Sequence, residues 1–134
     1  MRSPVSDEVI SSISLAMACD MVVAADDAQF GYPYPVAAYD HDGWRIGVLI
    51  CEDFWHPSLP MLQALDGAAL LVNVAAGPSR APGGPAGMAA IGGWHKMQDT
   101  YALLGTVPLA FCNRVGNEEG LTFWGGSRVV GADG

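Results

Sequence analysis

Three short apolar runs, separated by turn residues and by stretches of helical periodicity, predict the elements of the second part of the chain. The runs occupy residues 46–50, 68–76 and 107–112. Their β-branched and aliphatic composition is typical of strands that are buried on both faces. Helices are predicted between them, one capped by Ser58 and ended by Gly67, the other over residues 92–105. This strand-helix-strand-helix-strand order predicts an α/β fold with a largely parallel sheet and right-handed crossovers.

The segments outside these runs give weaker patterns. Residues 77–87 contain so many glycines and prolines that we expect a loop without regular structure, mobile or facing a ligand. Residues 121–130 predict a strand pair kinked by glycines. Near the N-terminus the pattern predicts a helix over about 7–18 and a strand over 21–25, followed by a break at 26–35.

Composition and charge exclude several classes of protein. The 134 residues are 51% hydrophobic, which is enough for a globular core. Fourteen acidic residues against six basic ones give a net charge of −8, so neither nucleic acid nor an anionic membrane surface is an expected partner. The three cysteines and three histidines show no zinc-like or disulfide-framework spacing. With no signal peptide and no membrane-length apolar run, we expect a cytoplasmic protein without a metal.

Cys51 is the residue with the clearest potential for chemistry. It directly follows the apolar run at 46–50 and precedes the sequence EDFW. Open α/β sheets carry their reactive groups at the carboxyl ends of the strands. A cysteine at that position is therefore either a nucleophile or a small apolar residue that completes a buried strand. The residues around it decide between these alternatives.

The segment from about residue 42 to 134 resembles the nitrilase superfamily, also called the carbon-nitrogen hydrolases. The resemblance rests on four pieces in order: GVLICEDFWHP, LDGAALLVNVAAGP, a tryptophan-led helix, and CNRVGNEEGLTFWGGSRVVGADG. It implies that residues 39–134 form part of an α-β-β-α sandwich domain. It also implies hydrolysis of a small amide or nitrile without a cofactor.

The same resemblance implies roles for individual residues. Cys51 corresponds to the nucleophile, whose attack on the amide or nitrile carbon gives a thioester. The backbone N–H groups of Glu52 and Asp53 face the developing oxyanion, and these acids also hold the turn. The candidates for the substrate pocket are Trp55, Glu118, Glu119 and Phe123. The alternative for these four residues is packing for the aromatics and simple solvation for the acids.

Two groups of the family's Glu-Lys-Cys site have no counterpart in this sequence. In the family the glutamate and the lysine come from segments upstream of the cysteine strand, and the single lysine here is Lys96, downstream of it. The sequence looks like a piece cut at both ends. We therefore expect no catalytic turnover by this chain alone.

Residues 10–34 resemble a different family, the enoyl-CoA hydratases or crotonases, through the stretch ISLAMACDMVVAADDAQFGYP. The oxyanion glycines of that family are replaced by Ile10, Ser11 and Ser12, and Tyr34 stands where its glutamate is expected. We therefore predict that residues 1–38 are a helix-strand segment of different origin.

Two functions are the alternatives to an amidase. The first is a noncatalytic fusion remnant that forms homo-oligomers through uncovered sheet or helix faces. The second, ranked third overall, is acyl-CoA binding.

Overall fold

The structure of the protein is a computed structural model that describes residues 37–79 and 84–134. The chain divides into two compact units, Met1–Pro35 and Val36–Gly134, and the second is described below. The predictions for the helix, the strand and the crotonase-like stretch of residues 1–38 lie almost entirely outside the described residues.

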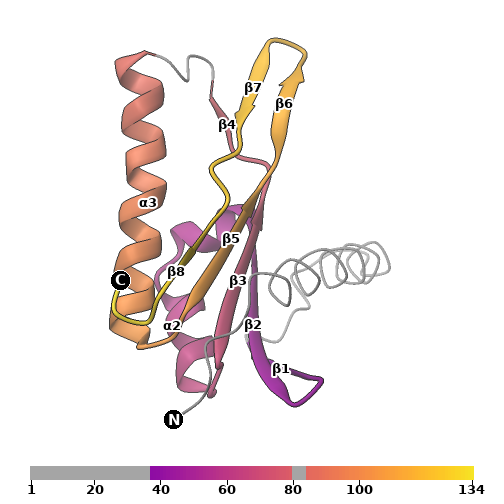
Figure 1. The fold of residues 1–134 in the computed structure, drawn as a ribbon, viewed down its shortest axis with the longest axis vertical. Coiled ribbons are helices and arrows are strands. Elements are labelled where there is room, and N and C mark those ends of the chain that lie inside the picture. Colours follow the sequence, from indigo (N-terminus) through magenta and orange to yellow (C-terminus); the bar gives the residue numbers. More distant parts are fainter. Residues whose placement is uncertain (1–36, 80–83) are drawn as a thin grey trace. The chain divides into compact units, whose positions relative to one another are not determined.

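The fold is a mixed α/β arrangement built on a five-stranded sheet (Figure 1). Its strands, in spatial order, are β1 (Tyr39–His41), β2 (Trp44–Ile50), β3 (Leu70–Ala75), β5 (Leu109–Asn113) and β8 (Arg128–Val130). The central strands β2, β3 and β5 are parallel, whereas β1 and β8 pair antiparallel at the two edges. The predicted α/β class, with its parallel core, is confirmed.

Two helices and one short 3-10 helix connect the central strands. The 3-10 helix η1 (Cys51–Trp55) follows β2 directly, and α2 (Ser58–Leu65) comes next. The prediction that Ser58 caps α2 is wrong: Ser58 is its first residue, and the cap position has no side-chain hydrogen bond. Pro57 occupies that position with φ −57° and ψ −26°, which are helical angles, so the helical path begins one residue before Ser58.

The glycine- and proline-rich segment contains more regular structure than we predicted. The helix α3 (Pro85–Gly105) begins well before residue 92, because proline fits the first turn, where a backbone N–H has no partner within the helix. At the other end of the segment, β4 (Pro78–Ser79) pairs with a distant strand. Composition alone does not reveal that pairing.

A second, three-stranded sheet has the order β4-β7-β6, with β6 (Val115–Glu118) and β7 (Leu121–Trp124) forming a hairpin. Its turn uses Glu119 and Gly120, with φ values of 48° and 81°, as a tight hairpin turn requires. The predicted strand pair over 121–130 is wrong, because β7 and β8 lie in different sheets on either side of Gly125 and Gly126. The hairpin extends beyond the end of the larger sheet (Figure 1).

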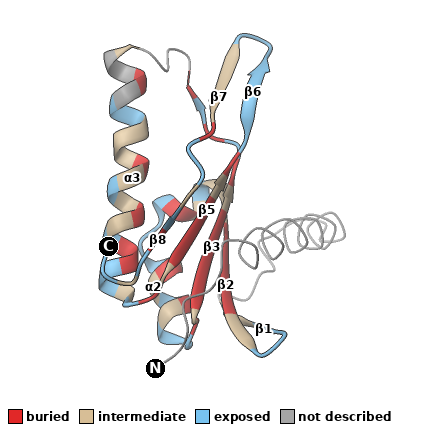
Figure 2. Ribbon diagram, viewed as in Figure 1, coloured by how far each residue is buried: buried red, intermediate tan, exposed pale blue. Residues whose placement is uncertain are grey.

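The hydrophobic core lies between the five-stranded sheet and its helices. Leu49, Leu71 and Leu109 share one face of the sheet by register and belong to one cluster of buried side chains. Phe54 of η1 fills this cluster, stacked on Trp94 at 5.9 Å between ring centroids. Buried residues are concentrated in β2, β3 and β5, whereas β6 is exposed (Figure 2). The core therefore supports the sheet edge at which Cys51 lies.

Candidate active site

Cys51 occupies a sharp turn between a strand and a helix. It is the first residue of η1, directly after Ile50 at the end of β2, and its φ of 47° is in the left-handed region. This conformation costs a non-glycine residue ~1–2 kcal/mol, so the surrounding structure must hold it. The thiol is half-buried and packs against the edge of the core cluster. Strained strand-to-helix turns of this kind present the nucleophile of many hydrolases.

The two acids after the cysteine differ: Glu52 is exposed, and Asp53 forms a hydrogen bond within the turn. The Ile50 N–H donates to Asp53 Oδ2 at 3.0 Å and closes the turn around Cys51. Glu52 is exposed, whereas Phe54 is fully buried and anchors η1 in the core. The first N–H groups of a helix have no intrahelical acceptor, and in η1 these groups lie directly beside the cysteine.

Two buried amide side chains hold carbonyl groups near the end of β2. Gln63 Nε2 donates to the Val48 carbonyl at 2.8 Å, and Asn73 Nδ2 donates to the Leu49 carbonyl at 3.3 Å. Both side chains are buried, with 4% of Gln63 and 0% of Asn73 exposed. Sequence reasoning missed them, although each is the single polar residue within an otherwise apolar stretch, LPMLQAL and LLVNVA.

Asn113, at the end of β5, ties together three segments at the same edge of the sheet. Its Oδ1 accepts from the Gly77 N–H at 2.7 Å, and its Nδ2 donates to the Gly125 carbonyl at 2.8 Å. Gly77 is confined, since a Cβ atom there would lie 3.2 Å from Trp124 Nε1. This network was also missed, because it joins residues that are far apart in the sequence.

The four predicted pocket residues lie in two places. Trp55 is 50% exposed and meets Trp94 edge to face at 5.4 Å. Phe123 and Glu118 both contact Arg114, the ring at 4.3 Å from the guanidinium carbon and the carboxylate at 2.6 Å from Nη2. Glu119 is exposed in the hairpin turn. Arg114 therefore brings two of the four together, and Trp55 lies apart on the helix side.

No charged side chain among residues 37–79 and 84–134 forms a hydrogen bond or an ion pair with the Cys51 thiol. Lys96 is exposed on α3, and the Glu118 carboxylate is engaged by Arg114. Within the same ranges, no group of three or more His, Cys, Asp or Glu side chains is arranged to hold a metal ion. The described part of the chain also has no helix that is both long and apolar enough to cross a membrane.

The sequence profile of the carbon-nitrogen hydrolases matches residues 13–134. This chain belongs to the carbon-nitrogen hydrolase family. The match begins inside the segment for which we predict a crotonase-like origin, and that origin stays a prediction.

Two relatives show how much of a family member this chain represents. A glutamine-dependent NAD(+) synthetase of Thermotoga maritima is 35% identical over 96 residues, which cover 67% of this chain and 15% of the synthetase. A probable nitrilase of Schizosaccharomyces pombe is 31% identical over 104 residues, which cover 78% of this chain and 34% of that protein. The chain thus spans about a third or less of the length of these two relatives.

Solved structures of the family share the fold. A carbon-nitrogen hydrolase from Helicobacter pylori superimposes with a TM-score of 0.69 at 27% identity, over 79% of this chain and 38% of that one. An amidase from Nesterenkonia AN1, also of the nitrilase superfamily, superimposes with a TM-score of 0.58 at 26% identity, over 79% of this chain and 36% of the amidase. The predicted resemblance to the superfamily is confirmed.

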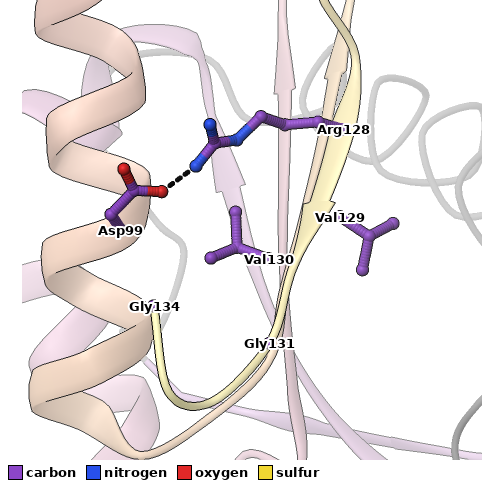
Figure 3. A pocket seen from close by; sticks show the side chains of 6 residues that line it. All are labelled: Asp99, Arg128, Val129, Val130, Gly131 and Gly134. Carbon is purple, nitrogen blue, oxygen red and sulfur yellow. Dashed lines mark hydrogen bonds and ion pairs between the residues drawn. The ribbon is translucent and has the colours of Figure 1, made fainter.

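A pocket of about 330 Å³ lies between α3 and the edge strand β8 (Figure 3). Its lining includes Asp99 of α3 and Arg128 of β8, which form an ion pair. Val130, also in the lining, pairs with Leu109, the first residue of β5, whereas Cys51 follows the last residue of β2. The pocket is therefore separate from the cysteine turn.

The surroundings of Asp66 and His95 lower the pKa values of both groups. The Ala38 N–H and the Arg45 guanidinium, which both donate to the carboxylate of Asp66, lower its pKa. Burial lowers the pKa of His95, and the nearby Arg128 charge adds to this effect. His95 also meets Trp124 edge to face at 6.0 Å.

Proposed function

We propose that this chain carries the nucleophile-bearing part of a carbon-nitrogen hydrolase, with Cys51 attacking the carbonyl carbon of a small amide. The thiolate sulfur forms a bond to carbon, and the amide nitrogen leaves as ammonia after gaining a proton. A water molecule then hydrolyses the thioester, releasing the carboxylic acid and the thiol. A nitrile is the alternative substrate, attacked at its carbon by the same sulfur.

The observation that carries this proposal is the left-handed turn at Cys51. A buried cysteine that merely completes a strand needs no unfavourable backbone angle, whereas a φ of 47° at the first residue of η1 turns the chain sharply at this thiol. Its place at the carboxyl edge of three parallel strands is the place where α/β sheets carry chemistry. In the proposed reaction, the N–H groups of Glu52 and Asp53 stabilise the oxyanion.

Two of the relatives support an amide as the substrate, whereas the Schizosaccharomyces pombe relative is a probable nitrilase. In a mutant of the amidase from Nesterenkonia sp. AN1, which is 27% identical with a TM-score of 0.55, the acetamide moiety of fluoroacetamide is added covalently at the active site cysteine. The Thermotoga maritima relative is a synthetase that depends on glutamine, whose side chain ends in a primary amide. Both relatives support a substrate with an unsubstituted amide group.

We also propose that these 134 residues alone do not complete the hydrolysis of an amide. A thiol needs a base to become a thiolate, and a tetrahedral oxyanion needs donors or a nearby cation. Lys96, the single lysine, is exposed on α3. We therefore expect a thioester at Cys51 with an activated substrate and no ammonia release from an ordinary amide.

The test uses p-nitrophenyl acetate, because its leaving group needs no protonation. We expect peptide mapping by mass spectrometry to place one acetyl group on Cys51 of the full chain. Cys112→Ala is the matched control, since Cys112 is another half-buried cysteine, in the parallel strand β5 of the same sheet, and this variant should acetylate normally. Cys51→Ala should lose the adduct. Equal acetylation of Cys112 and Cys51 in the wild-type chain would overturn the proposed nucleophile.

Exposed leucines favour a second candidate, a noncatalytic domain that forms homo-oligomers. Large apolar side chains are exposed near the C-terminal ends of α2 and α3, two helices that contact each other: Leu62 (47%), Leu65 (79%), Leu103 (56%) and Leu104 (63%). Exposed apolar patches of this kind mark association surfaces. Sedimentation velocity of wild type and Leu65→Asp tests this, with a shift from oligomer to monomer expected. A wild-type chain that is monomeric at all concentrations would exclude it.

A further inference from the structure

The outer edge of β2 loses its strand partner before the strand ends. β1 pairs only with Trp44, Arg45 and Ile46. The Arg45 carbonyl accepts from the Ala69 N–H on the β3 side, so by strand alternation the backbone groups of Val48 and Ile50 point to the other edge. Among residues 37–79 and 84–134, no strand covers that edge beyond Ile46.

Side chains supply the missing hydrogen bonds. Gln63 Nε2 from α2 donates to the Val48 carbonyl at 2.8 Å, and Asp53 Oδ2 accepts from the Ile50 N–H at 3.0 Å. The Val48 carbonyl belongs to a buried residue, and a buried carbonyl without a donor is strongly unfavourable. Gln63 therefore supplies, near the end of β2, the hydrogen bond that a neighbouring strand supplies elsewhere in the sheet.

Gly47 provides the space that this contact needs. A Cβ atom on Gly47 would lie 2.7 Å from Gln63 Oε1 and 2.6 Å from Leu71 Cδ2, both closer than such atoms approach. A glycine is needed at position 47 because the Gln63 side chain lies directly over it and leaves no room for a larger side chain. A glycine in the strand, three residues before Ile50, thus makes room for an amide side chain of the helix α2.

We propose that Gln63 is a positioning residue for Cys51. It contacts none of the reacting atoms; it fixes the carbonyl three residues before the cysteine, so that the strained turn keeps one orientation. The inference rests on the proposed function, because positioning has a catalytic meaning only if Cys51 is the nucleophile. A fixed turn keeps the sulfur aligned with the N–H groups of Glu52 and Asp53.

The test compares the full chain with Gln63→Met, which keeps the side-chain length and removes the donor. We expect amide hydrogen exchange of Ile50 and Cys51 to accelerate about fivefold, as for the loss of one hydrogen bond from a locally opening segment. Acylation of Cys51 by p-nitrophenyl acetate should fall by about the same factor. Alkylation by iodoacetamide, which forms no oxyanion, should not fall. A merely structural role would change both reactions together.

Gln63→Glu gives a readout in the pH profile. A protonated carboxyl donates to the Val48 carbonyl, whereas a carboxylate repels it, so protection of Ile50 should approach wild type at low pH and disappear as the pH rises. Exchange rates corrected for their intrinsic pH dependence should show no such step in Gln63→Met. A Gln63→Glu variant without this step would contradict the inference.

The two proposals fail in different ways. Equal acetylation of Cys112 and Cys51 in the wild type would remove the nucleophile, and the exchange data would still decide whether Gln63 holds the turn. Unchanged exchange and acylation in Gln63→Met, with Cys51 acylated normally in the wild type, would remove the positioning role alone. If Gln63→Met does not fold, exchange of the Gln63 carboxamide protons in the wild type decides: slow exchange supports the hydrogen bond and rapid exchange overturns it.

Discussion

The two ends of β2 are held by opposite kinds of interaction. At the start of the strand, the Arg45 guanidinium is partly exposed and pairs with Asp40 at 3.1 Å and Asp66 at 2.6 Å. At its end, the buried amides of Gln63 and Asn73 donate to backbone carbonyl groups. Exposed ion pairs are weakened by water and salt, whereas buried hydrogen bonds are not. The end that leads to Cys51 is therefore the one whose geometry is least sensitive to the solvent.

The largest expected effect is on the buried side of the cysteine turn. Phe54 is fully buried between Trp94 and Tyr101, so Phe54→Ala should lower the free energy of unfolding by ~3–5 kcal/mol. Trp55→Ala is the matched control in the same turn, and because half of Trp55 is exposed it should cost clearly less. Urea unfolding of both variants measures the difference. Equal losses would mean that the core does not anchor η1.

The second largest effect on stability is expected at Gly47, where the Gln63 side chain leaves no room for a Cβ atom. Gly47→Ala should destabilise the chain by ~1–3 kcal/mol, because the added methyl group overlaps Leu71 and Gln63. Gly92→Ala is the control: nothing lies within 4 Å of a Cβ there, and replacing this helical glycine should stabilise the chain by ~0.5–1 kcal/mol. Thermal unfolding of the two variants in parallel is sufficient. A neutral Gly47→Ala would show that α2 can move away from β2.

The smallest effect is expected at the exposed end of β2. The folded state lowers the pKa of Asp66 below 3.8, so this carboxylate stabilises the fold above that pH and loses its contribution as the pH falls through the lowered value. Asp66→Asn should therefore be less stable than wild type at neutral pH and approach it in acid. Added salt should narrow the gap at neutral pH. A gap that persists in both acid and high salt would indicate that packing, and not charge, dominates at this end.

The parallel core was predictable because its information is local. Each central strand is an apolar run whose length and composition identify it without reference to its neighbours, and Cys51 follows the first run directly. The same adjacency is sufficient to place the cysteine at the carboxyl edge of the sheet. The start of α3 and the strand β4 were missed, because the many prolines and glycines of this segment suggested a loop. The composition does not show that Pro85 begins a helix or that residues 78 and 79 pair with the distant strand β7.

The candidate site was predictable only in part. Glu118 and Glu119 were predicted from their resemblance to a family loop, and Trp55 and Phe123 as aromatic residues near the ends of the sheet. The structure brings Glu118 and Phe123 together through Arg114, a residue outside these predictions. Asn113 and Gln63 were absent from the predictions. Each acts through its side chain on backbone that only tertiary packing brings within reach.

The sequence by itself determined the α/β class, the order of the central elements and the position of Cys51 at the end of β2, because apolar runs and turn residues act over a few neighbouring positions. Only the tertiary structure decided which groups hold that end. The bond from Gln63 to the Val48 carbonyl spans 15 residues, and it exists because α2 packs over a glycine that leaves room for it. Such a bond depends on where two elements meet in space, and no local pattern of residues encodes that meeting.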